Sequence, residues 1–192
     1  MTVDMSYKMF TFLIIIMITQ DVHGTRCSAL NGTCKRECLS TETSVNGHGC
    51  CHHKKCCYAP CESGWLYLPG SNCYFFSTTS EDWETAKASC MYLGAKLSEP
   101  VTQSEIDYIS DIARSRSGTF WLGGTDTDNE GTFVWTSDNR NITLSNWAGG
   151  EPNNNDNMED CVNVHAKLGF LWNDSPCGSL SLFTCETKPL TI

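Results

Sequence analysis

Short apolar runs alternate with turn residues at the start of the region that follows residue 60. Residues 61–76 read CESGWLYLPGSNCYFF, with an apolar run on each side of Pro69-Gly70. A Pro-Gly pair between two such runs is typical of a tight turn, so we predict a β-hairpin. Cys61 and Cys73 stand where a disulfide would clip the two strands together.

Two helical patterns follow the hairpin. In residues 78–94 the apolar side chains recur at helical intervals, at Trp83, Ala86, Cys90 and Leu93. The pattern ends at Gly94, a residue type favoured just past the end of a helix. In the second pattern Thr102 and Glu105 have the spacing of a capping box, and three isoleucines follow on one face: Ile106, Ile109 and Ile112.

The remaining apolar segments are short and are separated by polar stretches. They are FWLGG (120–124), GTFVWTSD (131–138), VNVHAKLGFLWND (162–174) and SLFTCE (181–186). Segments of this length and composition are typical of strands. Because the helices come first and most of the strands afterwards, we predict an α+β fold.

The first 24 residues have the pattern of a secretory leader. Lys8 precedes an apolar run of about ten residues, Phe10 to Thr19, which is too short to span a membrane, and small residues near Gly24 suit cleavage. We therefore expect residues 1–24 to be a signal peptide and the mature protein to be secreted and soluble.

Cysteines and charge divide the rest of the chain at residue 60. All 13 cysteines follow the leader, seven of them between residues 27 and 57, which indicates disulfides and an oxidising compartment. The span 25–60 has a net charge of +3, whereas the chain as a whole has −9. We expect a basic, cysteine-rich module at 25–60, an acidic domain at 61–187 and a tail at 188–192.

The acidic domain contains the polar run GGEPNNNDNMEDC at residues 149–161, and a further Asn-Asp pair stands at 173–174. Carboxylate and amide oxygens are hard ligands that suit Ca²⁺. No His or Cys falls within 151–160, so zinc is a poor fit. We expect a divalent cation, rather than packing, to offset the repulsion in this loop and to order it.

Residues 61–186, nearly the whole of this domain, resemble the long form of the C-type lectin-like domain, in which an extra hairpin disulfide precedes the two helices. The residues that carry the resemblance are CESGW and CYFF, Cys90, WLGG (121–124), SNW (145–147), EPN (151–153), EDC (159–161), WND (172–174), Cys177 and Cys185. The resemblance implies two helices, antiparallel sheets and a long calcium-binding loop. It also implies a cis bond before Pro152 and the disulfides Cys61–Cys73, Cys90–Cys185 and Cys161–Cys177. The tryptophans are expected in the core rather than on a sugar-stacking surface.

The same resemblance implies calcium-dependent binding of sugars. In that family a sugar diol completes the coordination of the ion and hydrogen-bonds to its acid and amide ligands. Here the ligands would be Glu151, Asn153, Glu159, Asn173 and Asp174. The order acid-Pro-amide at 151–153 is the mannose type, which favours equatorial vicinal hydroxyls as in mannose, N-acetylglucosamine or fucose, whereas the galactose type reads Gln-Pro-Asp.

A second calcium site is implied at positions that the family uses for a structural ion. These positions hold Asp126, Glu130, Asn154, Glu159 and Asp160. Asn154 stands where many members of the family have Asp, so this site has one negative charge fewer, which weakens the expected binding of the ion.

The basic module has a different resemblance. Its cysteine spacing, with Gly49 before Cys50, is similar to that of β-defensin-like peptides and implies the pairs Cys27–Cys56, Cys34–Cys50 and Cys38–Cys57. Cys51 is extra, and either Cys50 or Cys51 fits the fourth position. A membrane-active module and a disulfide-stapled spacer both remain open for this segment.

Together these patterns predict a secreted, calcium-dependent lectin of innate defence that binds glycans, with microbial surfaces as the target and no enzymatic or nucleic-acid-binding motif. A covalent homodimer through the odd cysteine is a further expectation. The alternative is an antimicrobial or toxin-like effector at 25–60 for which the lectin domain is a carrier. Sequons for N-glycosylation stand at Asn31, Asn141 and Asn173; a glycan on Asn173 would block the calcium site, so we expect that residue to be unmodified.

Overall fold

The computed structural model describes residues 33–35, 43–45, 55–58 and 60–190. The chain divides into two compact units, Met1–Pro60 and Cys61–Ile192. In the first unit β1 (Thr33–Lys35), β2 (Thr43–Val45) and β3 (Lys55–Tyr58) form an antiparallel sheet in the order β1-β3-β2. Cys56 and Cys57 are buried and disulfide-bonded.

The expected leader and most of the cysteine-rich module lie outside the described residues. This holds for residues 1–24 and for one or both cysteines of each expected pair, Cys27–Cys56, Cys34–Cys50 and Cys38–Cys57. The defensin-like interpretation therefore stays a prediction.

The second unit is built on one mixed sheet. Its strands are β4 (Leu66–Tyr67), β5 (Cys73–Phe76), β6 (Lys96–Leu97), β7 (Phe120–Thr125), β8 (Val134–Trp135), β9 (Arg140–Asn141), β10 (Cys161–His165), β11 (Leu171–Ser175) and β12 (Leu182–Thr187). The main path runs β11-β10-β7-β12-β5-β4.

The resemblance implied antiparallel sheets, and among the strands of the described residues one pairing departs from this, because β12 runs parallel to β7. A parallel pair needs a long crossover connection, and the chain between these two strands is long enough to supply one. The hairpin expected at 61–76 is confirmed as β4 and β5, which pair antiparallel.

Both expected helices form. The first, α3 (Trp83–Tyr92), begins at Asp82, whose carboxylate accepts a hydrogen bond from the backbone N–H of Thr85 at 3.0 Å. The second, α4 (Gln103–Arg116), begins at the expected capping box of Thr102 and Glu105. Leu93 does not extend the buried face of α3: it lies beyond the last helical residue and is 44% exposed, because the backbone turns there into Gly94 at a φ of +69°.

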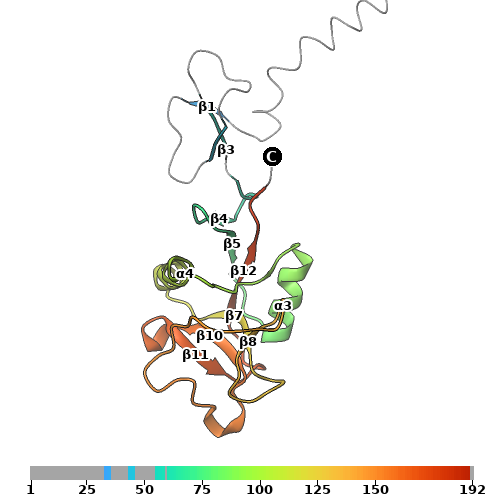
Figure 1. Ribbon diagram of the computed structural model, residues 1–192, viewed down its shortest axis with the longest axis vertical. Helices are drawn as coiled ribbons and strands as arrows, with labels where there is room; N and C mark the ends of the chain where they lie inside the picture. The colour runs from blue at the N-terminus through green and yellow to red at the C-terminus, as the bar shows by residue number, and fades with distance from the viewer. Residues whose placement is uncertain (1–32, 36–42, 46–54, 59, 191–192) are drawn as a thin grey trace, which may run out of the picture. The chain divides into compact units, whose positions relative to one another are not determined.

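The two helices cover opposite faces of the sheet, and they stand on either side of the central strands in Figure 1. Strand β7 shows why, since Phe120 and Leu122 join the core under α4 while Trp121 joins the core under α3. Alternate side chains of a strand point to opposite faces, so a strand covered on both sides reads as a continuous apolar run. Within the described residues, no helix has the length and apolar character needed to cross a membrane.

Three disulfides connect the elements of the second unit. They are the three that the resemblance implied, Cys61–Cys73, Cys90–Cys185 and Cys161–Cys177. The bond between Cys90 and Cys185 joins α3 to β12. The expectation for the tryptophans is confirmed as well: Trp121, Trp135 and Trp172 are fully or almost fully buried, and Trp65 and Trp147 pack against the core.

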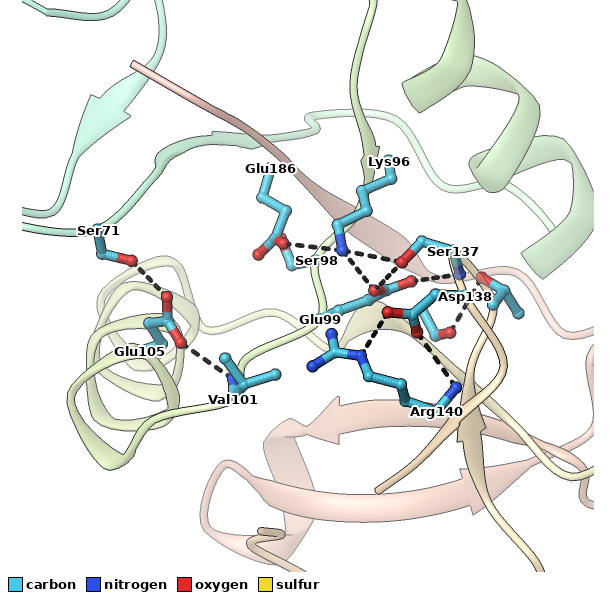
Figure 2. Close-up of polar contacts among 12 residues, drawn as sticks. Ser71, Lys96, Ser98, Glu99, Val101, Glu105, Ser137, Asp138, Arg140 and Glu186 are labelled. Atoms are coloured by element: carbon cyan, nitrogen blue, oxygen red, sulfur yellow. Dashed lines mark hydrogen bonds and ion pairs between the residues drawn. The ribbon is translucent and has the colours of Figure 1, made fainter. Parts of the chain in front are cut away.

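Two buried carboxylates, Glu99 and Glu105, accept hydrogen bonds from neighbouring loops and so hold these loops against the rest of the unit (Figure 2). Glu99 accepts hydrogen bonds from the backbone N–H and the hydroxyl of Ser137 at 2.9 and 2.6 Å, and it pairs with Lys96, which also lies 3.4 Å from Glu186. A side chain at Gly123 would place its Cβ 2.9 Å from Cγ of Glu99. Gly123, the first glycine of the WLGG sequence, therefore leaves room for the side chain of Glu99.

Glu105 is the second buried carboxylate, and its hydrogen bonds fix the start of α4. One of its oxygens accepts from the hydroxyl of Ser71, and the other accepts from the backbone N–H groups of Val101 and Thr102, each at 3.0 Å. Burial raises the pKa of Glu105, but the hydrogen bonds from Ser71, Val101 and Thr102 outweigh it and lower the pKa below its ordinary value.

We expect Glu105→Gln to lower the free energy of unfolding at pH 7 by about 1–2 kcal/mol, because a charged acceptor of several hydrogen bonds is lost. The folded-state pKa of Glu105 is depressed, so its stabilisation is present above the ordinary pKa of 4.5 and disappears as the pH falls through the lowered value. Chemical denaturation at a series of pH values measures both effects. Glu84→Gln, at an exposed acid in the first turn of α3, is the control; an equal loss in both variants at pH 7 contradicts the assignment.

Candidate functional site

The segment before the polar loop is fastened to the edge strand β11. The N–H of Ala148 donates to the carbonyl of Trp172, and the N–H of Trp172 donates to the carbonyl of Asn146, both at 2.8 Å. The N–H of Glu151 then donates to the carbonyl of Ala148 at 3.0 Å, and the following peptide bond, Glu151–Pro152, is cis as expected. These contacts place the start of the loop beside the Asn-Asp pair of β11.

Asp174 is the centre of the site. It is fully buried, and its two carboxylate oxygens accept hydrogen bonds from the backbone N–H groups of Asn153 and Asn154, at 3.2 and 2.7 Å. A carboxylate without exposure to water is stable only where donors surround it. The loop and the strand thus fix each other at this residue.

The second half of the loop is held in a similar way. The carboxylate of Glu159 accepts from the N–H of Asn155 at 3.0 Å, and the N–H of Glu159 donates to the side-chain oxygen of Asn154 at 3.1 Å. Between them lies a short 3₁₀ turn, η1 (Asn155–Asn157). Side chain-to-backbone hydrogen bonds thus contribute to the order of a loop for which the sequence predicted a cation, rather than packing, as the source of order.

Three carboxylates crowd this site. Burial raises the pKa of Glu151, and a hydrogen bond with Asp174 and the negative charges of Asp174 and Glu159 raise it further. Burial likewise raises the pKa of Glu159, with Asp174 and Asp156 adding to the effect against the hydrogen bond from Asn155. The ionised forms of Glu151 and Glu159 are therefore disfavoured unless positive charge is supplied.

The donor set fits a hard divalent cation. One oxygen of Glu151, Oε2, is buried and has no hydrogen-bond partner among the described residues. A cation that binds oxygen would supply the missing partner and remove the repulsion between Glu151, Glu159 and Asp174. No three His, Cys, Asp or Glu side chains of the described residues already stand in a coordinating arrangement; the oxygens of Asp174 and Glu159 instead face backbone N–H groups.

The amide members of the predicted set differ in their surroundings. Asn153 is exposed, whereas Asn173 is half-buried and its side-chain nitrogen donates to the hydroxyl of Ser175 at 2.9 Å and to the carbonyl of Asp174. Sequence reasoning missed Ser175, whose hydroxyl also accepts from Asn163 at 2.8 Å. The only available indication was its place two positions after Asn173 in the same strand.

The second predicted set also gathers in part. Asp126 is buried, its N–H donates to the carbonyl of Asp160 at 3.2 Å, and its Oδ1 has no partner among the described residues. Burial raises the pKa of Asp126 to about 6, and the charges of Glu130 and Asp160 add to this against a hydrogen bond from Gly131. Asn154, a member of the second set, contacts the primary set, since its N–H donates to Asp174 and its side-chain oxygen accepts from the N–H of Glu159.

We expect Asp174→Asn to lower the pKa of Glu151 in chelator-treated protein, because the substitution removes the negative charge and weakens the hydrogen bond that raise it. Asp156→Asn is the matched control, since Asp156 lies in the same loop and acts on Glu159 but not on Glu151. Carbon-13 NMR titration of the Glu151 carboxyl measures the shift. An unchanged value in Asp174→Asn, or an equal fall in both variants, contradicts this account of the site.

Comparison with known proteins shows which family has this fold and loop. The model of the Lectin C-type domain matches residues 79–187. Among curated relatives, ladderlectin from Oncorhynchus mykiss is 33% identical over 122 residues, which cover 62% of this chain and 63% of ladderlectin. The C-type lectin mannose-binding isoform from Notechis scutatus scutatus is 35% identical over 140 residues, which cover 69% of this chain and 85% of that protein.

Solved structures share the fold. The mouse scavenger receptor C-type lectin carbohydrate-recognition domain superposes with a TM-score of 0.63 at 29% identity and covers 69% of this chain and 99% of its own. A calcium-independent type II antifreeze protein superposes with a TM-score of 0.60 at 28% identity, covering 68% and 95%. Proteins with this domain are generally carbohydrate-binding rather than enzymatic, and some with the fold act without calcium. The match over 79–187, together with the helices, disulfides and loop described above, shows that the chain belongs to the C-type lectin domain family.

Proposed function

We propose that this protein is a secreted, calcium-dependent lectin that binds sugars with equatorial vicinal hydroxyls, such as mannose, N-acetylglucosamine and fucose. The residues proposed to hold calcium are Glu151, Asn153, Glu159, Asn173 and Asp174. When bound, calcium would supply the coordination that two neighbouring sugar hydroxyls complete.

The chain's own side chains set the direction of the hydrogen bonds to the sugar. Glu151 and Glu159 would accept from the two hydroxyls, while Asn153 and Asn173 would donate to them. A site built for one hydrogen-bond direction leaves polar groups unpaired when the diol has the wrong geometry. The order Glu151-Pro152-Asn153 is therefore the basis for proposing mannose-type rather than galactose-type sugars.

The observation that carries the proposal is the crowding of Glu151 and Glu159 against buried Asp174, with one oxygen of Glu151 lacking a partner. Such a cluster is costly as a purely structural feature and suits a divalent cation. The likeness to a calcium-independent antifreeze protein shows that the fold alone does not require the metal, so the proposal rests on these residues rather than on the fold. The mannose-binding name of the Notechis relative supports the sugar class.

A second calcium ion is proposed at Asp126, Glu130, Asn154, Glu159 and Asp160. The buried, unpartnered oxygen of Asp126 supports it, and the neutral Asn154 would make this ion the more weakly held of the two. Disulfides within the domain support an extracellular site of action. Recognition of microbial glycans in innate defence is the proposed use. It would gain from linking several weak sites, for example by a disulfide through the odd cysteine.

The central experiment is retention of the full chain on immobilised mannose. We expect retention in calcium, and elution by a chelator or by free mannose, because the sugar is held through the metal and its ligands. Immobilised galactose is the control surface and should retain little protein. Retention on mannose that a chelator leaves unchanged contradicts the proposal.

A paired substitution tests the sugar class. Glu151→Gln combined with Asn153→Asp exchanges acceptor and donor, so mannose retention should fall at least about tenfold and galactose retention should rise. Asn157→Asp alters an exposed residue of the same loop outside the proposed ligands and should leave both unchanged. If the double variant keeps its preference for mannose, these two residues do not select the sugar.

A further inference from the structure

A groove of about 540 Å³ lies between α3 and the β8–β9 hairpin; none of the five proposed primary ligands lines it, but Asp126 of the proposed second calcium site does. Hydroxyl and amide side chains supply much of its wall: Thr125, Thr127, Asn129, Thr132, Thr136 and Asn139. Its volume is within the range of small-ligand sites, about 300–1,000 Å³. The groove thus offers many neutral hydrogen-bonding groups to an occupant, beside four charged side chains: Glu84, Lys87, Asp126 and Asp128.

Asn141 also lines this groove, and the pairing of β8 with β9 explains why. Asn141 stands directly opposite Val134, and residues opposite each other in an antiparallel pair project to the same face. The neighbour of Val134, Trp135, is buried in the core under α4, so Val134 and Asn141 face the other way. Both side chains are therefore presented to the groove.

Asn141, Ile142 and Thr143 form an N-glycosylation sequon, and the surroundings of Asn141 suit modification. Asn141 and Thr143 are exposed, and the side-chain amide of Asn141 makes no hydrogen bond to the described residues. Asn173, in the other described sequon, is half-buried and donates its side-chain nitrogen to Ser175. Only Asn141 of these two leaves its nitrogen available for a glycosidic bond.

We propose that Asn141 carries an N-linked glycan and that the inner sugars of this glycan lie in the groove between α3 and the β8–β9 hairpin. The glycan's hydroxyl and acetamido groups would exchange hydrogen bonds with Thr127, Asn129 and Asn139, all of which are exposed in the groove wall. Val134 supplies an apolar floor beside the attachment point. Asp126, a proposed ligand of the second calcium ion, also lines the groove, whereas none of the proposed primary ligands does. The inference therefore does not depend on the sugar that the primary site selects.

The first arm of the test asks whether Asn141 is modified. The full chain is expressed in a eukaryotic secretory host, and peptide mapping by mass spectrometry is performed after glycosidase release in heavy-oxygen water. We expect Asn141 to be converted to labelled Asp. Thr143→Ala should abolish the modification at this residue, whereas Thr143→Ser, which keeps the sequon, should retain it. Unmodified Asn141 in the secreted protein overturns the proposal.

The second arm asks whether the glycan lies in the groove. An endoglycosidase that cuts within the chitobiose core should act about tenfold more slowly on native than on denatured protein, because cleavage follows the fraction of time for which the sugars are released from the surface. Thr127→Tyr narrows the groove and should bring the native rate close to the denatured rate. Thr78→Tyr, at an exposed threonine outside the groove, should leave the native cleavage rate unchanged. Equal rates for native and denatured wild-type protein overturn the assignment of the groove.

Discussion

The site depends on the burial of one carboxylate. Asp174 is inaccessible to water, and the backbone N–H groups of Asn153 and Asn154 take the place of solvent around it. Those two hydrogen bonds determine the path of the loop after Pro152, and they bring Glu151 and Glu159 within range of the same negative charge. The ionised forms of Glu151 and Glu159 are disfavoured beside this charge, so the arrangement favours a bound positive charge that would offset the repulsion.

The sheet provides the rigid base for this loop. Strands β7 and β10 are buried along almost their whole length, with α3 packed on one face of the sheet and α4 on the other. Asp174 of edge strand β11 connects the loop to this sheet through its hydrogen bonds from the loop backbone. The disulfide Cys161–Cys177 fixes the far end of the loop. Residues that contact a ligand are more precisely placed on such a frame than on an unsupported loop.

Local patterns in the sequence predicted the parts of the fold that local chemistry decides. The capping box at Thr102, the helical spacing of Trp83 and Ala86, and the turn at Pro69-Gly70 each involve residues a few positions apart. The parallel pairing of β12 with β7 was not predicted, because the hydrophobic pattern of a strand does not determine which other strand it pairs with. The candidate ligands followed from family resemblance, but the capture of Asp174 by backbone N–H groups and the role of Ser175 did not. Both depend on hydrogen bonds between residues 12 to 21 positions apart, which no short pattern records.

The position of β12 has a consequence for biosynthesis. This strand is the last of the unit along the chain, yet it occupies the middle of the sheet, between β7 and β5, and it carries the partner of Cys90. During translation the two apolar faces of the sheet cannot close until Leu182–Thr187 has left the ribosome, although most of the domain has been made by then. The aromatic core residues of the nascent chain are therefore exposed to aggregation until synthesis of the domain is nearly complete, and chaperones would meet the chain in that open form.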